Sequence, residues 1–121
     1  MLILGIALAG AVGAPARYVV DIVVIERTEG GLPVGTLVIN VTGSFLLGLI
    51  TGFALYHAFP STPRTILATG FCGAYTTFST FAYEVVRLAE AGAHRAALRV
   101  LLASLIVPAL AAALGLALAS L

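Results

Sequence analysis

Residues 70–81 read GFCGAYTTFSTF and lie in the middle of the third of four apolar stretches. Two glycines followed by threonines and a serine disfavour an uninterrupted helix. A break would release carbonyls, which suit hard cations, and amide N–H groups, which favour anions. Inside a bilayer, such groups persist only when they are buried in protein or line a water-filled cavity. The alternative is a continuous helix whose hydroxyl groups bond back to its own carbonyls.

The sequence around this segment predicts an integral membrane protein. Of its 121 residues, 61% are hydrophobic and 9% are charged, and the mean hydropathy is +1.15. A soluble chain this short could not bury so much apolar surface. Each apolar stretch approaches the ~20 residues that cross ~30 Å of hydrocarbon. We therefore expect an all-α fold with a single domain, residues 1–121, and four transmembrane helices at about 2–25, 33–59, 63–88 and 96–121.

The charged residues limit which partners are possible and indicate the orientation in the membrane. A net charge of +1 without a basic cluster argues against nucleic acid as a partner. Short connections place both termini on one side of the membrane. Arg64 lies on that side, whereas four arginines lie on the other, so the positive-inside rule favours termini outside the cell. The four are Arg27, Arg87, Arg95 and Arg99.

Small and polar residues recur every four positions in the second stretch: Thr36, Asn40, Ser44, Gly48 and Gly52. This spacing places them on one slowly drifting helix face. Close helix packing explains the glycines but leaves the polar residues unexplained. The two N–H donors of Asn40 suit an anion, and a hydrogen bond to a neighbouring helix is the alternative.

Aromatic and charged residues complete the set of candidates. Phe78 and Phe81 share a helix face with Glu84, and the electropositive ring edges could line an anion path. Core or lipid packing is the alternative for both rings. Arg17 lies one turn from Asp21, so the two could neutralise each other, or Arg17 could draw anions into a vestibule.

Three segments together resemble the Fluc-type (CrcB) fluoride channels. They are GAVGAPARY at residues 10–18, GTLVINVTGSF at residues 35–45 and the segment at residues 70–81. The resemblance implies an antiparallel, dual-topology dimer with two fluoride pores and a third helix broken near the middle of the membrane. It also implies a structural sodium ion at the dimer centre, held by the backbone carbonyls of Gly73 and Thr76 from each subunit.

The resemblance also implies the residues of the fluoride path. These are Asn40, Phe78, Phe81, Thr77, Ser79, Thr36 and Ser104, with Arg17 near a vestibule and Glu84 as an accessory residue. The chain departs from the family in its fourth stretch, where Ser104 is the only polar residue in mid-span. The uneven arginine count leaves open a fixed orientation with a paralogous sister subunit in place of a homodimer.

The predicted function is therefore a fluoride channel, not an enzyme. We expect it to export fluoride passively from the cytoplasm, as a multi-pass protein of the inner (plasma) membrane of a prokaryote. Many weak donors along a path can replace the water around fluoride without trapping the ion. A small dimeric proton-coupled exporter is the alternative, but it needs an isolated carboxylate, whereas Asp21 lies near Arg17 and Glu84 lies beyond the break. A structural scaffold subunit is a third possibility.

Overall fold

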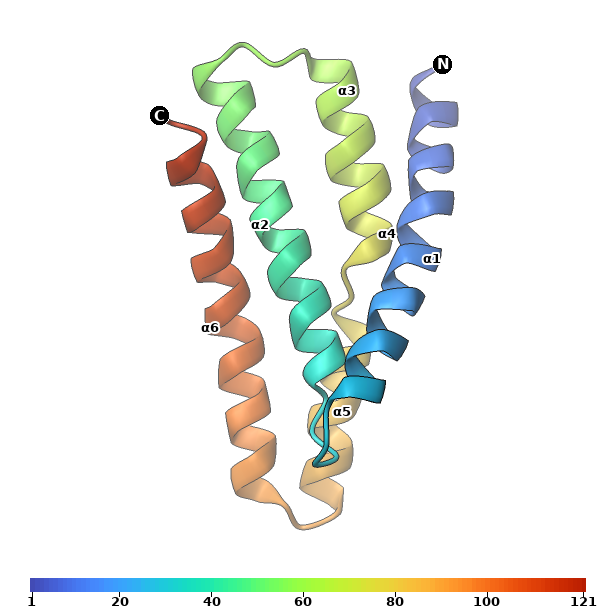
Figure 1. The fold of residues 1–121 in the computed structure, drawn as a ribbon, viewed down its shortest axis with the longest axis vertical. Helices are drawn as coiled ribbons and strands as arrows, with labels where there is room; N and C mark the ends of the chain where they lie inside the picture. The colour runs from blue at the N-terminus through green and yellow to red at the C-terminus, as the bar shows by residue number, and fades with distance from the viewer.

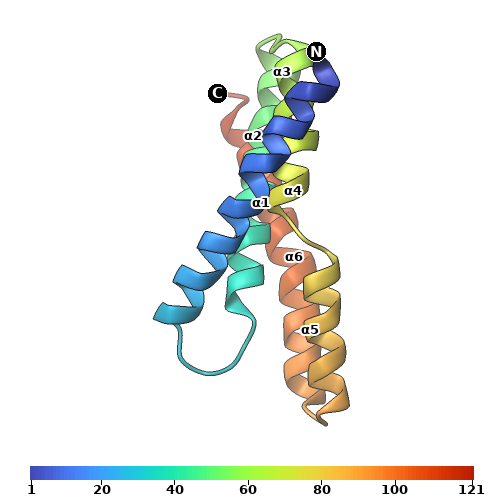
Figure 2. The same ribbon diagram turned by 90° about the vertical axis from the view of Figure 1, so that its right-hand side faces the viewer.

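The computed structural model describes residues 1–121 and is entirely helical (Figure 1). Both termini lie at the same end of the molecule in both ribbon views (Figures 1 and 2). The helices are α1 (Leu2–Arg27), α2 (Val34–Tyr56), α3 (Ser61–Thr65), the π-helix η1 (Ile66–Cys72), α4 (Gly73–Tyr75), α5 (Ser79–Glu90) and α6 (His94–Leu118).

Helices α1, α2 and α6 are long and apolar enough to cross a membrane. The all-helical membrane class expected from the sequence is therefore confirmed. The third expected span, at 63–88, falls on α3, η1, α4 and α5, and residues 76–78 between α4 and α5 are not helical.

The helix ends differ by a few residues from the ends of the apolar stretches. Helix α1 continues to Arg27, two residues beyond the expected end, and α6 begins at His94 instead of residue 96. Helix α2 covers residues 34–56 instead of 33–59, and α6 ends at Leu118. Hydropathy locates the hydrocarbon region, whereas backbone hydrogen bonds and capping residues decide where a helix stops.

The end of α5 shows such a cap. Gly92 has a positive φ of 78°, and its N–H donates to the Ala89 carbonyl. The next N–H, from Ala93, donates to the Leu88 carbonyl. This pair of bonds is a Schellman motif, which glycine adopts without the penalty that a Cβ would bring. It turns the chain sharply into α6.

Glycines bring α2 and α6 into backbone contact along their length. A Cβ added at Gly48 would overlap the Ala112 carbonyl oxygen, and one at Gly115 would overlap the Phe45 carbonyl oxygen. The same contact continues at Gly52, where a Cβ would lie 2.5 Å from the Cβ of Ala119. The small-residue stripe predicted in the second stretch therefore packs against α6 through Gly48 and Gly52.

The segment before the break packs against α1 in the same manner. A Cβ at Gly70 would lie 2.7 Å from the Ile6 carbonyl oxygen, and one at Gly13 would lie 2.5 Å from the Phe71 carbonyl oxygen. Figure 2 shows α1 crossing in front of this segment near α4. Helix η1 therefore packs against α1 shortly before the break at residues 76–78.

The chain has a thin core. Only 17 of the 121 residues are buried, and Ile39 is the largest side chain among those that are fully buried. Many large apolar side chains are exposed on α1 and α6, among them Leu8, Val12, Leu110 and Leu114. Such outward apolar faces suit lipid as the surrounding medium.

Candidate functional site

Residues 76–78 interrupt the helix, and a side chain of α2 takes a hydrogen bond that a continuous helix would need. Thr76 has an extended backbone with φ −81° and ψ 161°. In a continuous helix the Thr77 N–H would donate to the Gly73 carbonyl. It donates instead to Asn40 Oδ1 at 2.9 Å. The Gly73 carbonyl is therefore released from the helical ladder.

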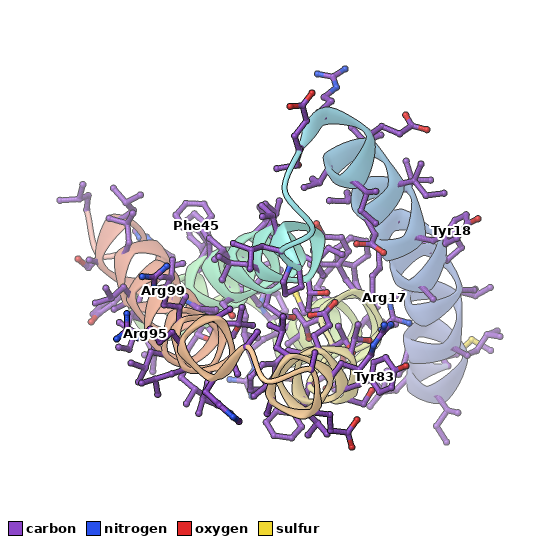
Figure 3. All side chains as sticks on the ribbon, turned by 90° about the horizontal axis from the view of Figure 1, so that it is seen from below. Arg17, Tyr18, Phe45, Tyr83, Arg95 and Arg99 are labelled. Atoms are coloured by element: carbon purple, nitrogen blue, oxygen red, sulfur yellow. The ribbon has the colours of Figure 1, made fainter.

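A hydroxyl group releases a second carbonyl at the same place. The Thr80 N–H, which would donate to the Thr76 carbonyl in a continuous helix, donates to Thr77 Oγ1 at 3.3 Å. The Thr76 carbonyl accepts a bond from Arg17 Nη1 at 3.4 Å. Figure 3 shows Arg17 pointing inward from α1, whereas Tyr18 points outward. Arg17 thus lies beside the break.

Asn40 pairs with both polar groups of one residue. Its Nδ2 donates to the Thr77 carbonyl at 2.8 Å, while its Oδ1 accepts the Thr77 N–H. The side chain is only 9% exposed. The pairing uses one of the two N–H groups of the amide and leaves the second. The structure thus contains the bond to a neighbouring segment that was one of the two alternatives, and it retains one donor for a ligand.

A hollow of about 320 Å³ brings most of the candidate residues together. It lies between α2, the break and α6. Of the residues expected at the sodium site and along the fluoride path, seven line this hollow: Asn40, Gly73, Thr76, Thr77, Phe78, Phe81 and Ser104. Thr36, Ser79, Arg17 and Glu84 do not belong to its wall.

The two phenylalanines in the wall form one unit. Their ring centroids are 5.1 Å apart and the rings are inclined at 81°, an edge-to-face arrangement. Phe81 is 5% exposed, whereas Phe78 is 74% exposed. The Phe81 ring is fixed by its surroundings, whereas the Phe78 ring is largely free of contacts within this chain.

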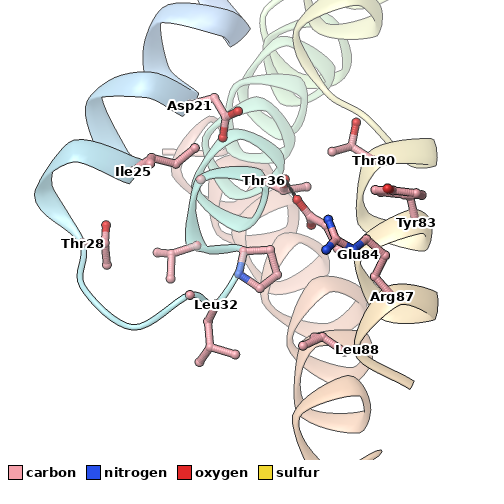
Figure 4. Close-up of a pocket in the computed structure, with 14 residues that line it drawn as sticks. Asp21, Ile25, Thr28, Leu32, Thr36, Thr80, Tyr83, Glu84, Arg87 and Leu88 are labelled. Atoms are coloured by element: carbon pink, nitrogen blue, oxygen red, sulfur yellow. Dashed lines mark hydrogen bonds between the residues drawn. The ribbon is translucent and has the colours of Figure 1, made fainter. Parts of the chain in front are cut away.

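Thr36 and Glu84 meet in a different cavity, of about 520 Å³ (Figure 4). The Thr36 hydroxyl donates to Glu84 Oε1 at 2.7 Å. Glu84 Oε2 is buried without a hydrogen-bond partner. Asp21 and Arg87 line the same cavity, so this part of the wall carries both signs of charge.

The two serines of the predicted path differ in position. Ser79 is exposed, and its Oγ lies 3.5 Å from Thr77 Oγ1 at the start of α5. Ser104 lies in α6 between two cavities, because it lines both the 320 Å³ hollow and an apolar pocket of about 170 Å³ with Arg99. Both hydroxyls therefore lie near the break, and only that of Ser104 belongs to the wall of the hollow.

The oxygen atoms at the break suit a hard monovalent cation. No cluster of three histidine, cysteine, aspartate or glutamate side chains occurs in the chain. The released carbonyls of Gly73 and Thr76 are neutral oxygen donors, the type that hard cations such as sodium accept. Gly73 also lines the hollow, and a Cβ there would meet no heavy atom closer than the Ala68 carbonyl oxygen at 4.0 Å.

Two polar contributions near the hollow were not among the predicted site residues. Ser44 lines the hollow one turn after Asn40. Thr42 and Tyr75 join their hydroxyl groups at 2.8 Å and thus tie α2 to the end of α4. Ser44 could have been found from the i, i+4 stripe, whereas nothing in the sequence pairs Thr42 with Tyr75.

Comparisons with known proteins point to one family. The family model described as CrcB-like protein, Camphor Resistance (CrcB), matches residues 4–116. Fluoride-specific ion channel FluC 1 of Leifsonia xyli subsp. xyli is 54% identical over 98 residues, which cover 81% of this chain and 72% of that protein. Fluoride-specific ion channel FluC 2 of Cutibacterium acnes is 46% identical over 121 residues, covering 99% and 98%. Fluoride-specific ion channel FluC 2 of Mycolicibacterium paratuberculosis is 45% identical over 118 residues, covering 97% and 93%. All three relatives are named as channels, not enzymes.

Proposed function

This chain belongs to the CrcB-like family, and from that membership we propose that it is a channel that conducts fluoride passively out of a prokaryotic cytoplasm. It is a multi-pass membrane protein of a family of channels, not enzymes. The observation that carries the proposal is the similarity to relatives named as fluoride-specific ion channels, one of them 46% identical over 121 residues. The family match over residues 4–116 includes every candidate site residue. Export would lower the concentration of toxic fluoride inside the cell.

The proposed fluoride path runs along the 320 Å³ hollow. The remaining N–H of Asn40, the hydroxyls of Thr77 and Ser104, and the ring edges of Phe78 and Phe81 are all neutral donors at this wall. Several weak donors at successive positions along the path can replace the water around fluoride without binding the ion too tightly to release it. Ser79 would extend this track at the break, and Thr36 with the accessory Glu84 would extend it into the larger cavity.

The proposed sodium site uses the carbonyls of Gly73 and Thr76. Their release from the helical ladder supports this assignment, as do their neutral oxygen atoms. When bound, sodium would supply a fixed positive charge that holds the two broken helix ends together. Arg17 would then be a second cation beside the same carbonyls, with its charge available to a vestibule.

The proposed assembly is an antiparallel dimer of four-span subunits in the inner (plasma) membrane. In each subunit, α3, η1, α4 and α5 would form the third span, with the break near the middle of the bilayer. The 74% exposure of Phe78 supports a second subunit, because a ring in a closed path needs cover on that side. The partner would be a second copy or a paralogous sister chain.

One observation favours a second candidate function. A buried, unpartnered carboxylate oxygen, as in Glu84, is the kind of group that a proton-coupled exporter uses. Such an exporter would transport against a fluoride gradient when given a proton gradient, whereas a channel would not. Accumulation of fluoride against its gradient would therefore select the exporter.

The decisive experiment is fluoride efflux from liposomes that hold the purified protein, with chloride as the control anion. We expect fluoride flux without chloride flux. Phe81→Ile should reduce this flux at least about tenfold by removing the ring edge, while Phe53→Ile, outside the hollow on α2, should keep it. Equal chloride and fluoride fluxes, or none for fluoride, would refute the proposed function.

A further inference from the structure

We propose that Asn40 is a positioning residue for the cation: its amide captures the Thr77 N–H and so keeps the Gly73 carbonyl free for coordination. This inference rests on the proposed function, since it concerns the sodium site of that channel. It adds a role to the one expected for Asn40, which is donation to the anion. The two roles use different atoms of the same side chain.

The first step is the geometry of the pairing. Asn40 Oδ1 accepts the Thr77 N–H at 2.9 Å, and Nδ2 donates to the Thr77 carbonyl at 2.8 Å. A buried N–H must find an acceptor. Without Oδ1, the nearest acceptor in a helical path is the Gly73 carbonyl, four residues earlier. Asn40 and Gly73 therefore compete for one donor, and Asn40 holds it in the structure.

The second step is the fixed position of Asn40 relative to the break. Helix α2 approaches the break closely because residue 43 is glycine: an added Cβ would overlap the methyl group of Thr76 and lie 3.1 Å from Tyr75 Cδ1. The neighbouring Ile39 is 2% exposed. The Thr42 and Tyr75 hydroxyls add a second bond between the two segments. Because α2 is anchored on both sides of Asn40, the amide can hold residue 77 away from helical geometry.

The third step is that Gly73 lies at the wall of a cavity. It lines the hollow, and the heavy atom nearest to the position that a Cβ would occupy is the Ala68 carbonyl oxygen at 4.0 Å. A carbonyl of a residue in the wall of a cavity, with its helical donor diverted, has the properties of a cation ligand. Asn40 would act on the cation through the peptide of Thr77, as residues outside a metal's direct ligand set commonly do.

The test measures sodium binding without measuring transport. The purified full chain is heated in detergent, in sodium chloride or in N-methyl-D-glucamine chloride of equal ionic strength, and the unfolding midpoint is followed by circular dichroism. In the wild type, sodium should raise the midpoint. Asn40→Leu has a similar size and lacks both hydrogen bonds, and it should lower the apparent sodium affinity at least about tenfold.

A second substitution distinguishes this mechanism from general damage. Proline at position 77 has no N–H, so nothing can close onto the Gly73 carbonyl. The residue before a proline prefers an extended backbone, and Thr76 already has φ −81° and ψ 161°. Proline also lacks the Thr77 hydroxyl that takes the Thr80 N–H, so its matched partner is Asn40→Leu/Thr77→Val, which lacks the same hydroxyl but keeps the N–H. Asn40→Leu/Thr77→Pro should therefore respond to sodium more strongly than Asn40→Leu/Thr77→Val.

Each outcome either supports or overturns the inference. A full sodium response in Asn40→Leu would overturn the inference, and so would equal sodium responses in the two double variants. Ser44→Ala, one turn away in the same hollow, is the matched control and should keep the response. If the Asn40→Leu variants do not fold, Thr77→Pro and Thr77→Val decide, because a weaker sodium response in Thr77→Pro than in Thr77→Val would refute the inference. A sodium response that depends on Asn40 without any fluoride flux would keep this inference and refute the proposed function.

Discussion

The α2–α6 pair and the interrupted segment from α3 to α5 are built from similar small residues, yet they behave in opposite ways. In the pair, Gly48 and Gly115 bring two helices into backbone contact, and both helices continue through the contact. In the interrupted segment, the backbone leaves the helix at residues 76–78. Gly70 packs against α1, but Gly73 faces open space. Small residues alone therefore do not determine whether a helix packs or breaks.

The difference lies in what the facing element presents. Helix α6 presents backbone atoms to the α2 glycines, among them the Ala112 and Leu116 carbonyl oxygens, and the glycines fit closely against them. Helix α2 presents Asn40 to the interrupted segment, and that amide takes backbone bonds from residue 77. A polar side chain with the right reach converts a packing contact into a break with free carbonyls.

The largest effect expected from this comparison comes from filling the α2–α6 contact. Gly48→Ala places a methyl group on the Ala112 carbonyl oxygen, so the helices must separate. We expect a loss of about 2 kcal/mol in the free energy of unfolding, typical of overpacking. Reversible unfolding in mixed detergent micelles, followed by circular dichroism, measures it.

The control for this prediction is Gly10→Ala in α1. A Cβ there would meet the Gly70 carbonyl oxygen at 3.6 Å, an ordinary contact. The variant should therefore unfold with nearly the same free energy as the wild type. Equal losses in Gly10→Ala and Gly48→Ala would show that close approach at Gly48 does not matter.

A smaller effect is expected at the first turn of α5. Thr77→Val keeps the shape of the side chain but removes the oxygen that accepts the Thr80 N–H. Loss of such a cap costs about 1 kcal/mol of unfolding free energy. Hydrogen exchange of the first α5 amides should accelerate. Thr51→Val is the control, since that hydroxyl bonds only to the Leu47 carbonyl within its own helix, and faster exchange in both variants would contradict the cap.

The third effect has the opposite sign. Gly73→Ala meets no steric barrier, and residue 73 already has helical φ −62° and ψ −36°. Replacing glycine at a compatible position stabilises a fold by about 0.5 kcal/mol. We expect this gain in the unfolding free energy of the sodium-free protein. A loss as large as that of Gly48→Ala would erase the contrast between the two regions.

The smallest effect is expected at Ser79. Its hydroxyl is exposed and makes only a 3.5 Å contact with Thr77 Oγ1. Ser79→Ala should change the unfolding free energy by less than about 0.5 kcal/mol, as thermal unfolding would measure. A change as large as that of Thr77→Val would mean that both hydroxyls hold the break.

The membrane class could be predicted because it depends on local composition, whereas the contacts of the candidate site depend on partners far apart in the chain. The glycines and threonines of residues 70–81 allowed either a broken or a continuous helix. The structure differs from the continuous alternative because Asn40, 37 residues before Thr77, takes the critical bond. No local pattern encodes that pairing.

Arg17 shows the same limit. Its spacing from Asp21 allowed mutual neutralisation within one helix, but its guanidinium donates to the Thr76 carbonyl, 59 residues away. The Asp21 carboxylate lies instead against Gly35, where an added Cβ would overlap it. Thr36 and Glu84, 48 residues apart, form a further pair that the spacing in either segment does not indicate.

The thin core has a consequence for how this protein responds to temperature. With 17 of 121 residues buried, separating the helices within a bilayer moves apolar side chains from protein to lipid and hardly at all into water. The large heat-capacity change of unfolding in soluble proteins comes from hydrating apolar surface. Stability in lipid should therefore vary almost linearly with temperature, with neither a pronounced optimum nor cold denaturation.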